Sequence, residues 1–415
     1  MSNAVSEKVA NGVVNGFCAP GFERVAEAFI NNFNERGESG ANVCLTHEGE
    51  TKVDLWGGVA DPATGKAWQE DTLSIVFSST KGITALCANM LLDQGKMDLK
   101  QPVAEIWPEF AVNGKETATV EMMLNHTVGV PVFRDPVPQG LFYDWDAVTK
   151  TLAEMEPWWL PGNSQGYHAV TFAWTVGELI RRVTGKSVGA VIQEFLSQPL
   201  GLDLWCGLPE EQEHRVAPMQ PVALEEGQQP SAFVQYVFAN PTSISANFLM
   251  NDGGFSAGIN DRAAHVCEIP SANGITNGRG LAGAYRPFAN GGTVDGKKFV
   301  SDVTLGRMGE ISAATNRDET LLIRARFGLG FMMSMDNRAA RDGMQDSAIM
   351  GRHAFGHVGA GGSIGFADPD AGMSFGYNMN KMGASIMLNE RGQDLVDAAY
   401  LSLGYKDNAP GYWRK

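Results

Sequence analysis

Strand-like patterns lie near both ends of the chain and helical patterns fill its middle, and this order limits the fold more than any other feature. Apolar and polar residues alternate on both sides of a turn at residues 48–50, which predicts an early hairpin. A second hairpin is predicted around residues 368–372. Its outgoing strand has one apolar side, formed by Met373, Phe375, Tyr377 and Met379. Each hairpin therefore has a face to bury.

One sheet that takes strands from both ends of the chain satisfies this requirement. We predict an α/β (α+β) fold with an antiparallel sheet flanked by helices at 21–36 and near 395–403. The sheet domain is expected to take residues 1–95 and 293–415, with a mostly helical domain at 96–292 inserted between them. A cleft between two such domains is a natural place for a ligand.

Further elements follow from the spacing of apolar residues. Helices are predicted at 120–126, 145–156, 170–184 and 187–197, and strands at 328–333 and 354–358. The helix at 170–184 has the strongest pattern, because five apolar residues line one face and Gly185 supplies a stop.

The composition argues against several classes of function. With 415 residues and 44% hydrophobic content, the chain has enough apolar material for a large core and two packed domains. A net charge of -15 without a cluster of Lys and Arg argues against a nucleic acid or an anionic membrane surface as partner. No stretch is long enough to span a bilayer. Residues 1–20 lack a basic start and an apolar block, so we expect no secretory signal.

The cysteines and histidines show no metal-binding or disulfide pattern. The five cysteines are widely spaced and include no C-x-x-C pair: Cys18, Cys44, Cys87, Cys206 and Cys267. We interpret them as free thiols in a reducing cytoplasm. The seven histidines show no H-x-x-x-H spacing, so neither a metal site nor a cofactor is expected.

Residues 75–83 combine a short apolar run with a helix that opens on a serine. From Ile83 onward apolar residues recur at helical spacing, which places Ser78 at or beside a helix N-terminus. Residues three apart share a helix face, so the Lys81 amine is expected within reach of the Ser78 hydroxyl. A serine becomes nucleophilic only when a base takes its proton, and a lysine is a base only when its pKa is lowered.

Two later motifs accompany this S-x-x-K motif in a fixed order. Tyr167-His168-Ala169 precedes the predicted helix at 170–184, and a Gly-rich run, His357-Val358-Gly359-Ala360-Gly361-Gly362, follows a late strand. The order resembles the serine β-lactamase and penicillin-binding protein superfamily, with its S-x-x-K, Y-x-N and K-T-G elements. More narrowly it resembles the family VIII carboxylesterases, which share the class C β-lactamase fold. The run Leu124-Asn125-His126-Thr127-Val128-Gly129 is also similar to a loop of this superfamily.

The resemblance implies a role for each motif residue. Ser78 would be the acylated nucleophile, with Lys81 and Tyr167 as its base system. The backbone amides of Ser78 and Ala360 would hold the oxyanion. The substrate-binding residues would be His357, Gly359 and Ala169. A phenol titrates near ~10, and a neighbouring ammonium is expected to lower the pKa of Tyr167 and help it shuttle a proton. The expected partner is a small-molecule ester with a short acyl chain, and the oligomeric state is left open.

Two positions depart from the β-lactamase pattern. Ala169 replaces an asparagine that contacts the substrate amide, and His357 replaces a lysine that contacts the substrate carboxylate. An imidazole with a pKa near ~6.5 is mostly uncharged at neutral pH. The pattern therefore favours an esterase over a β-lactamase or DD-peptidase. An acyltransferase would use the same residues, and a non-catalytic binding protein would not need them. For His126 and His168 we favour structural roles.

Two other serines match the G-x-S-x-G hydrolase pattern, Ser256 and Ser363. The elbow that activates such a serine needs a strand, a sharp turn and then a helix. Ser363 begins a predicted hairpin strand, and Ser256 lies in a predicted loop. Neither is therefore expected to be the nucleophile.

Overall fold

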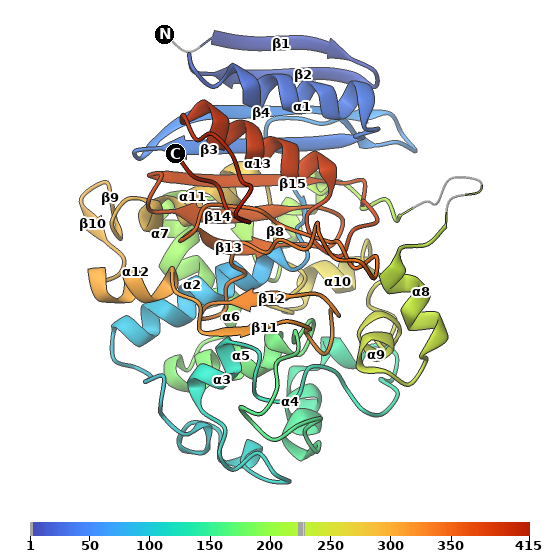
Figure 1. Ribbon diagram of the computed structural model, residues 1–415, viewed down its shortest axis with the longest axis vertical. Helices are drawn as coiled ribbons and strands as arrows, with labels where there is room; N and C mark the ends of the chain where they lie inside the picture. Colours follow the sequence, from blue (N-terminus) through green and yellow to red (C-terminus); the bar gives the residue numbers. More distant parts are fainter. Residues whose placement is uncertain (1–2, 223–226, 228) are drawn as a thin grey trace.

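The computed structural model describes residues 3–222, 227 and 229–415, and an antiparallel sheet forms one side of it (Figure 1). The eight-stranded sheet has the order β1-β2-β4-β3-β15-β14-β13, with β5 paired to β4. Its strands are β1 (Asn3–Val9), β2 (Gly12–Cys18), β3 (Gly40–His47), β4 (Glu50–Asp61), β5 (Lys66–Ala67), β13 (Phe355–Val358), β14 (Ile364–Asp368) and β15 (Met373–Met379).

Strands from the two ends of the chain meet where β3 pairs with β15, with Val43 opposite Tyr377. The prediction of one sheet built from both termini is therefore confirmed. The predicted hairpins are also present, as β3-β4 and β14-β15. Glu48 and Gly49 between β3 and β4 both have positive φ, 51° and 79°, which suits a two-residue hairpin turn.

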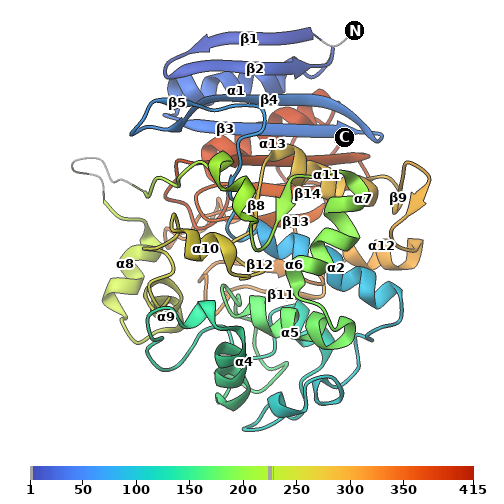
Figure 2. The same cartoon turned by 180° about the vertical axis from the view of Figure 1, so that it is seen from behind.

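Helices cover both faces of the sheet (Figures 1 and 2). The predicted terminal helices are present as α1 (Glu23–Glu35) and α13 (Glu390–Ser402), and they pack against each other on one face. On the other face, α11 (Gly278–Ala289) packs against β3, β14 and β15. The approach is close, because a Cβ added at Gly376 of β15 would lie 2.3 Å from the Gly278 carbonyl oxygen.

Helix α2 (Ser79–Asp93) lies between the sheet and the helical region. It contacts β13 and β14 on one side and α5 (Phe172–Thr184) and α6 (Val188–Ile192) on the other. Every residue from Ser79 to Leu91 is buried. The sequence pattern predicted one buried face, but packing from both sides encloses the whole helix.

The other helices and short strands complete the fold. The helices are η1 (Val103–Glu105), η2 (Pro108–Phe110), α3 (Val120–Leu124), η3 (Leu141–Tyr143), α4 (Trp145–Glu154), the π-helix η4 (Gln193–Ser197), α7 (Gln198–Leu200), η5 (Glu210–Arg215), α8 (Ala232–Ala239), α9 (Ile244–Met250), α10 (Arg262–Val266) and α12 (Asp302–Met308). The strands are β6 (Ser74–Ile75), β7 (Leu204–Trp205), β8 (Ile275–Thr276), β9 (Thr293–Val294), β10 (Lys297–Lys298), β11 (Ala313–Thr315) and β12 (Ala325–Phe327). In the described part of the chain no helix is long and apolar enough to cross a membrane.

The predicted strand at 328–333 is wrong. The strand there is β12, which ends at Phe327, and the following residues turn back, with the Gly328 amide donating to the Phe331 carbonyl (2.9 Å). Gly330 has a φ of 85° and lies close to Ala85 of α2, where a Cβ would come within 2.6 Å of the alanine side chain. The alternation of apolar residues and glycines resembles the pattern of a strand, but in the structure the glycines allow the chain to turn.

Candidate active site

The loop before α2 turns sharply at Phe77, whose φ of 43° lies in the left-handed region. A bulky residue held there costs about 1–3 kcal/mol and persists only where the surroundings fix the backbone. Ser78 follows directly and stands at the N-terminus of α2. It is partly exposed, whereas the helix behind it is buried. The strained turn therefore presents the serine at an accessible edge of the core.

Side-chain hydrogen bonds fix this turn from two directions. The hydroxyls of Ser79 and Ser363 are 3.0 Å apart, and Ser363 Oγ donates to the Val76 carbonyl oxygen (2.8 Å). Thr80 Oγ1 accepts a hydrogen bond from the Gly274 amide (2.8 Å). The sheet and the helical region thus both hold the turn that carries Ser78.

The Lys81 amine lies beside the Ser78 hydroxyl, as the three-residue spacing predicts. Its Nζ donates to Ser78 Oγ (3.0 Å) and to the Ser271 carbonyl oxygen (2.9 Å). Lys81 is fully buried, and the described chain places no carboxylate in a salt bridge with it. Burial lowers the pKa of Lys81 well below its usual value. A neutral amine has a free lone pair, so this lysine can accept the serine proton.

Tyr167 reaches the same place from the loop before α5. Its ring centroid is 4.9 Å from Lys81 Nζ, and its ring stacks on Phe327 of β12 at a centroid distance of 5.8 Å. The His357 ring is also stacked on it, at 5.8 Å. The structure therefore brings Ser78, Lys81 and Tyr167 together from distant parts of the chain.

The predicted direction of the Tyr167 pKa shift is wrong. Burial raises the pKa of Tyr167 far above its usual value, a hydrogen bond with Ser78 lowers it, and the Asp318 carboxylate raises it again. The expected lowering by a Lys81 ammonium is not among these effects, and burial lowers the pKa of Lys81 itself. Burial therefore favours the neutral form of both groups, the unprotonated amine of Lys81 and the protonated phenol of Tyr167.

The Gly-rich run after β13 packs against the turn that carries Ser78. A Cβ added at Gly359 would lie 2.2 Å from the Val76 carbonyl oxygen and 2.2 Å from Ser363 Oγ. Only a glycine allows this approach. Ala360 follows, exposed, and neither its amide nor that of Ser78 donates a hydrogen bond to a described residue. Both amides are thus free to bind an oxyanion.

His357 is buried near the end of β13, and its pKa does not stay near the ~6.5 that the sequence analysis used for an imidazole. Burial, with a smaller contribution from Lys81, lowers the pKa of His357 to about 3. Its Nδ1 lies 2.7 Å from the Val358 carbonyl oxygen, to which it donates, and this leaves Nε2 as an unpartnered acceptor. Ala169 is buried too and offers no polar side-chain group.

The other two histidines of the motifs form a support behind Tyr167. His168 Nδ1 donates to the Gly166 carbonyl oxygen (2.7 Å), and its Nε2 accepts from the Val130 amide (3.1 Å). His126 Nδ1 accepts from the His168 amide (3.1 Å), and the His126 ring lies 5.2 Å from that of Tyr167. Burial lowers the pKa of both imidazoles, so both are neutral. The contacts agree with the structural roles predicted for them.

Neither alternative serine has a base beside it. Ser363 is buried and donates to the Val76 carbonyl oxygen, so it supports the turn. Ser256 is exposed in a turn where its amide donates to Asp252 (2.8 Å). The helix that an activating elbow needs does not follow either of them directly.

Three contributors to the site were not foreseen from the sequence. The Ser271 carbonyl positions the Lys81 amine, Phe327 stacks on Tyr167, and Asp318 accepts a hydrogen bond from the Tyr167 amide (3.0 Å). Each acts through a backbone group or a packing contact between segments far apart in the chain. No short motif marks such residues.

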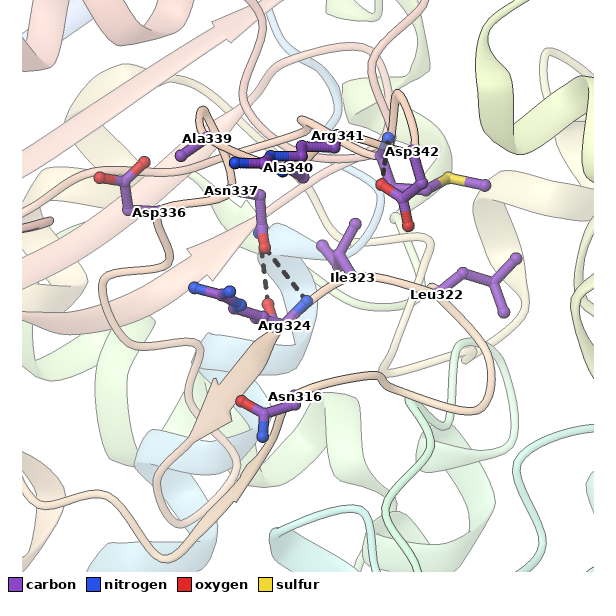
Figure 3. A pocket seen from close by; sticks show the side chains of 11 residues that line it. Asn316, Leu322, Ile323, Arg324, Asp336, Asn337, Ala339, Ala340, Arg341 and Asp342 are labelled. Atoms are coloured by element: carbon purple, nitrogen blue, oxygen red, sulfur yellow. Dashed lines mark hydrogen bonds between the residues drawn. The ribbon is translucent and has the colours of Figure 1, made fainter.

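Two hollows lie along the segment around β12. One, of about 300 Å³, is lined by Arg324, Asp336, Arg341 and their neighbours (Figure 3). A second, of about 280 Å³, shares Arg324 and Asp336 with it. Neither Ser78 nor Lys81 lines them. Among the described residues, no three His, Cys, Asp or Glu side chains gather in a way that suits a metal ion.

Comparison with known proteins agrees with this geometry. Residues 23–399 match the protein family described as Beta-lactamase, and the chain therefore belongs to the beta-lactamase family. The predictions of a β-lactamase-like fold and of a serine hydrolase are confirmed.

Individual relatives are similar over nearly the whole chain. Esterase/beta-lactamase LipL of Mycobacterium tuberculosis is 33% identical over 397 residues, which cover 91% of this chain and 85% of that protein. The crystal structure of a family VIII carboxylesterase is 37% identical, with a TM-score of 0.78 and coverage of 94% of this chain and 99% of the other. A penicillin-binding protein homologue from Caulobacter crescentus is 36% identical, with a TM-score of 0.80 and coverage of 94% and 99%. The resemblance to family VIII carboxylesterases is thereby confirmed.

The depressed pKa of Lys81 predicts a pH-dependent stability difference between wild type and Lys81→Met. A folded state whose lysine has a lowered pKa binds fewer protons than the unfolded state, so wild-type stability rises with pH up to the unfolded pKa of ~10.4. The methionine variant lacks this contribution. Its melting temperature relative to wild type should therefore fall as the pH is raised from ~7 to ~10.

The control is Lys186→Met, which removes an exposed lysine paired with Glu194. Comparing the two variants at each pH separates the buried amine from the general effect of losing one positive charge. A pH-independent difference between wild type and Lys81→Met would show that the buried amine keeps an ordinary pKa.

Proposed function

We propose that the protein is a serine carboxylesterase that hydrolyses short-chain acyl esters through an acyl-enzyme on Ser78. The observation that carries this proposal is the buried Lys81 amine 3.0 Å from Ser78 Oγ. A buried lysine with a lowered pKa can act as a general base at neutral pH.

In the acylation step, Ser78 Oγ attacks the ester carbonyl while its proton passes to the neutral Lys81 amine. Tyr167 is the acid: its phenol proton goes to the leaving alcohol, and Lys81 returns a proton to the phenolate. The directions of both pKa shifts support this resting state, with an unprotonated amine and a protonated phenol. The tetrahedral intermediate places its oxyanion at the free amides of Ser78 and Ala360.

In the deacylation step, water takes the position that the alcohol left. Tyr167 first passes its phenol proton to Lys81, the phenolate then takes the proton of the attacking water, and the protonated Lys81 gives its proton to Ser78 Oγ as the acyl bond breaks. An acyltransferase would place a second alcohol where this water attacks, and the same residues would serve it. The names of the mycobacterial relative and of the family VIII structure support ester hydrolysis as the main reaction.

The surroundings of Tyr167 favour a neutral, mostly apolar substrate. Phe327 and Phe248 both lie against its ring, the latter edge-on at a centroid distance of 6.5 Å. His357 is uncharged, and Ala169 has no amide for a substrate carbonyl. A substrate carboxylate would lose hydration here without gaining an ion pair. These features support short neutral esters over β-lactams as substrates. Gly359, the third predicted substrate-binding residue, would contribute only a close backbone contact.

A cytoplasmic location is part of the proposal. All five cysteines are unpaired, which suits a reducing compartment. The proposed partner is a small-molecule ester.

Ser78→Ala should lower turnover of p-nitrophenyl butyrate by at least about a thousandfold, because it removes the hydroxyl that the Lys81 amine contacts. Treatment with an organophosphonate should add one adduct to wild type and none to Ser78→Ala, as measured by intact mass. Ser256→Ala should keep wild-type turnover. Ser363→Ala should still be labelled on Ser78, although its melting temperature should fall with the loss of the bond to Val76. An adduct mapped to Ser256 or Ser363 would contradict the assignment.

Wild type should prefer p-nitrophenyl butyrate to nitrocefin by about a hundredfold or more in kcat/KM, since an unpaired buried charge costs about 2–5 kcal/mol. Because the pKa of His357 is about 3, this ratio should stay constant between about pH 6 and pH 8. His357→Lys adds a positive charge and should reduce the preference for the ester over nitrocefin. His357→Gln is uncharged and should leave this preference unchanged. Nitrocefin turnover equal to that of the ester in wild type would favour the β-lactamase alternative.

A further inference from the structure

A buried carboxylate holds the backbone of Tyr167. Asp318 is completely buried, and its Oδ1 accepts three amide hydrogen bonds, from Tyr167 (3.0 Å), Thr320 (2.9 Å) and Leu321 (2.9 Å). Two of these amides belong to its own turn, but the Tyr167 amide comes from a segment 151 positions earlier in the chain. The carboxylate therefore ties the catalytic loop to the segment before β12.

The same two segments are joined at two further points. The Glu319 amide donates to the Gln165 carbonyl oxygen (3.0 Å), two residues before Tyr167. Phe327, at the end of β12, stacks on the Tyr167 ring with an interplanar angle of 9°. Residues 318–327 thus fix both the backbone and the ring plane of Tyr167.

The negative charge of Asp318 is not needed to build this turn. An asparagine side chain has one carbonyl oxygen that could accept the same three hydrogen bonds without the cost of burying a charge. Oδ2 has no partner, and no salt bridge to a described cation compensates it. Burial raises the pKa of Asp318 to about 6. Because burying this carboxylate is costly and the turn does not need its charge, we infer that the charge has a function other than building the turn.

Other side-chain atoms of the same two segments are buried and unpaired as well. Both amide atoms of Gln165 and the Thr320 hydroxyl are also buried without a partner among the described residues. Leu322, in the same turn, has a φ of 63°, which is strained for a bulky residue. Unsatisfied polar atoms and backbone strain within two joined segments are typical of functional sites.

Few other charges act on Asp318. Glu319, next to it, is exposed and raises its pKa further. The facing segment carries the Tyr167 phenol, whose pKa Asp318 raises, and His168, whose pKa is lowered to about 3. Helix α9, which contacts the turn through the Ser245 hydroxyl (2.7 Å to the Thr320 carbonyl oxygen), has no titratable residue. His126, behind the Tyr167 ring, is kept neutral by burial.

We propose that Asp318 is a positioning residue for Tyr167, and that its ionised carboxylate sets the acidic limit of the enzyme's activity. Hydrogen bonds to a charged acceptor are about twice as strong as those to a neutral one, so protonation weakens the anchor on the Tyr167 amide. Activity should therefore fall as the pH falls through about 6. The proposal rests on the proposed proton-transfer role of Tyr167.

The test is the pH profile of kcat/KM for p-nitrophenyl butyrate in wild type, Asp318→Asn and Glu319→Gln, followed at the isosbestic wavelength of the product. Asp318→Asn should keep the melting temperature and KM, lower kcat several-fold at neutral pH, and lose the acidic limb near pH 6. Glu319→Gln is the matched control: it should keep kcat and move the limb to lower pH, because its charge raises the pKa of Asp318. Asp318→Ala, which also removes the acceptor, should lose on the order of a hundredfold.

Two outcomes would overturn the proposal. One is an Asp318→Asn profile that superimposes on wild type. The other is a uniform loss of activity with the acidic limb unchanged, which would indicate a structural role only. Tyr167→Phe is measured in parallel: if it keeps more than about a tenth of wild-type turnover, the proton-transfer role of Tyr167 fails instead.

Discussion

The burial of one lysine amine beside one serine is the interaction on which the rest of the site depends. An exposed lysine has a pKa near ~10.4 and carries no free lone pair at neutral pH. Lys81 has no exposed surface, and desolvation lowers its pKa well below the usual value, which favours the neutral amine that the proposed base role requires. Its two hydrogen bonds, to Ser78 Oγ and to the Ser271 carbonyl oxygen, hold the amine beside the serine. The enclosure of α2 between the sheet and the helices α5 and α6 provides this burial.

Several features of this arrangement lower the stability of the folded protein. Phe77 is held in a left-handed conformation, and the buried imidazole of His357 and the carboxylate of Asp318 each leave a polar atom without a partner. Costs of this kind are compensated by the large continuous core and by the hydrogen bonds that Ser79, Ser363 and Thr80 make around the turn. A strained backbone and unpaired buried polar atoms near an active site are expected where a protein gives up stability for activity.

The sequence predicted the parts of the fold and site that depend on local spacing. The hairpin strands, the terminal helices and the Ser78–Lys81 pair follow from periodicity, whereas Tyr167 and Ala360 needed the order of motifs. The strands β1 and β2 were missed because a short, polar, Gly-containing edge hairpin resembles a loop. Burial of α2 on all sides, the raised pKa of Tyr167 and the role of Asp318 depend on contacts between distant segments, which no local pattern encodes.

The ionisation of Lys81 tests this account most directly. The protein, isotope-labelled at the ε-carbons of its lysines, would be titrated by NMR, with Lys81→Met identifying the resonance. We predict that the Lys81 signal already has the chemical shift of a neutral amine at pH values where the exposed lysines remain charged, because burial lowers its pKa. A Lys81 signal that titrates together with the exposed lysines, near pH ~10.4, would contradict the central claim that this amine is the base.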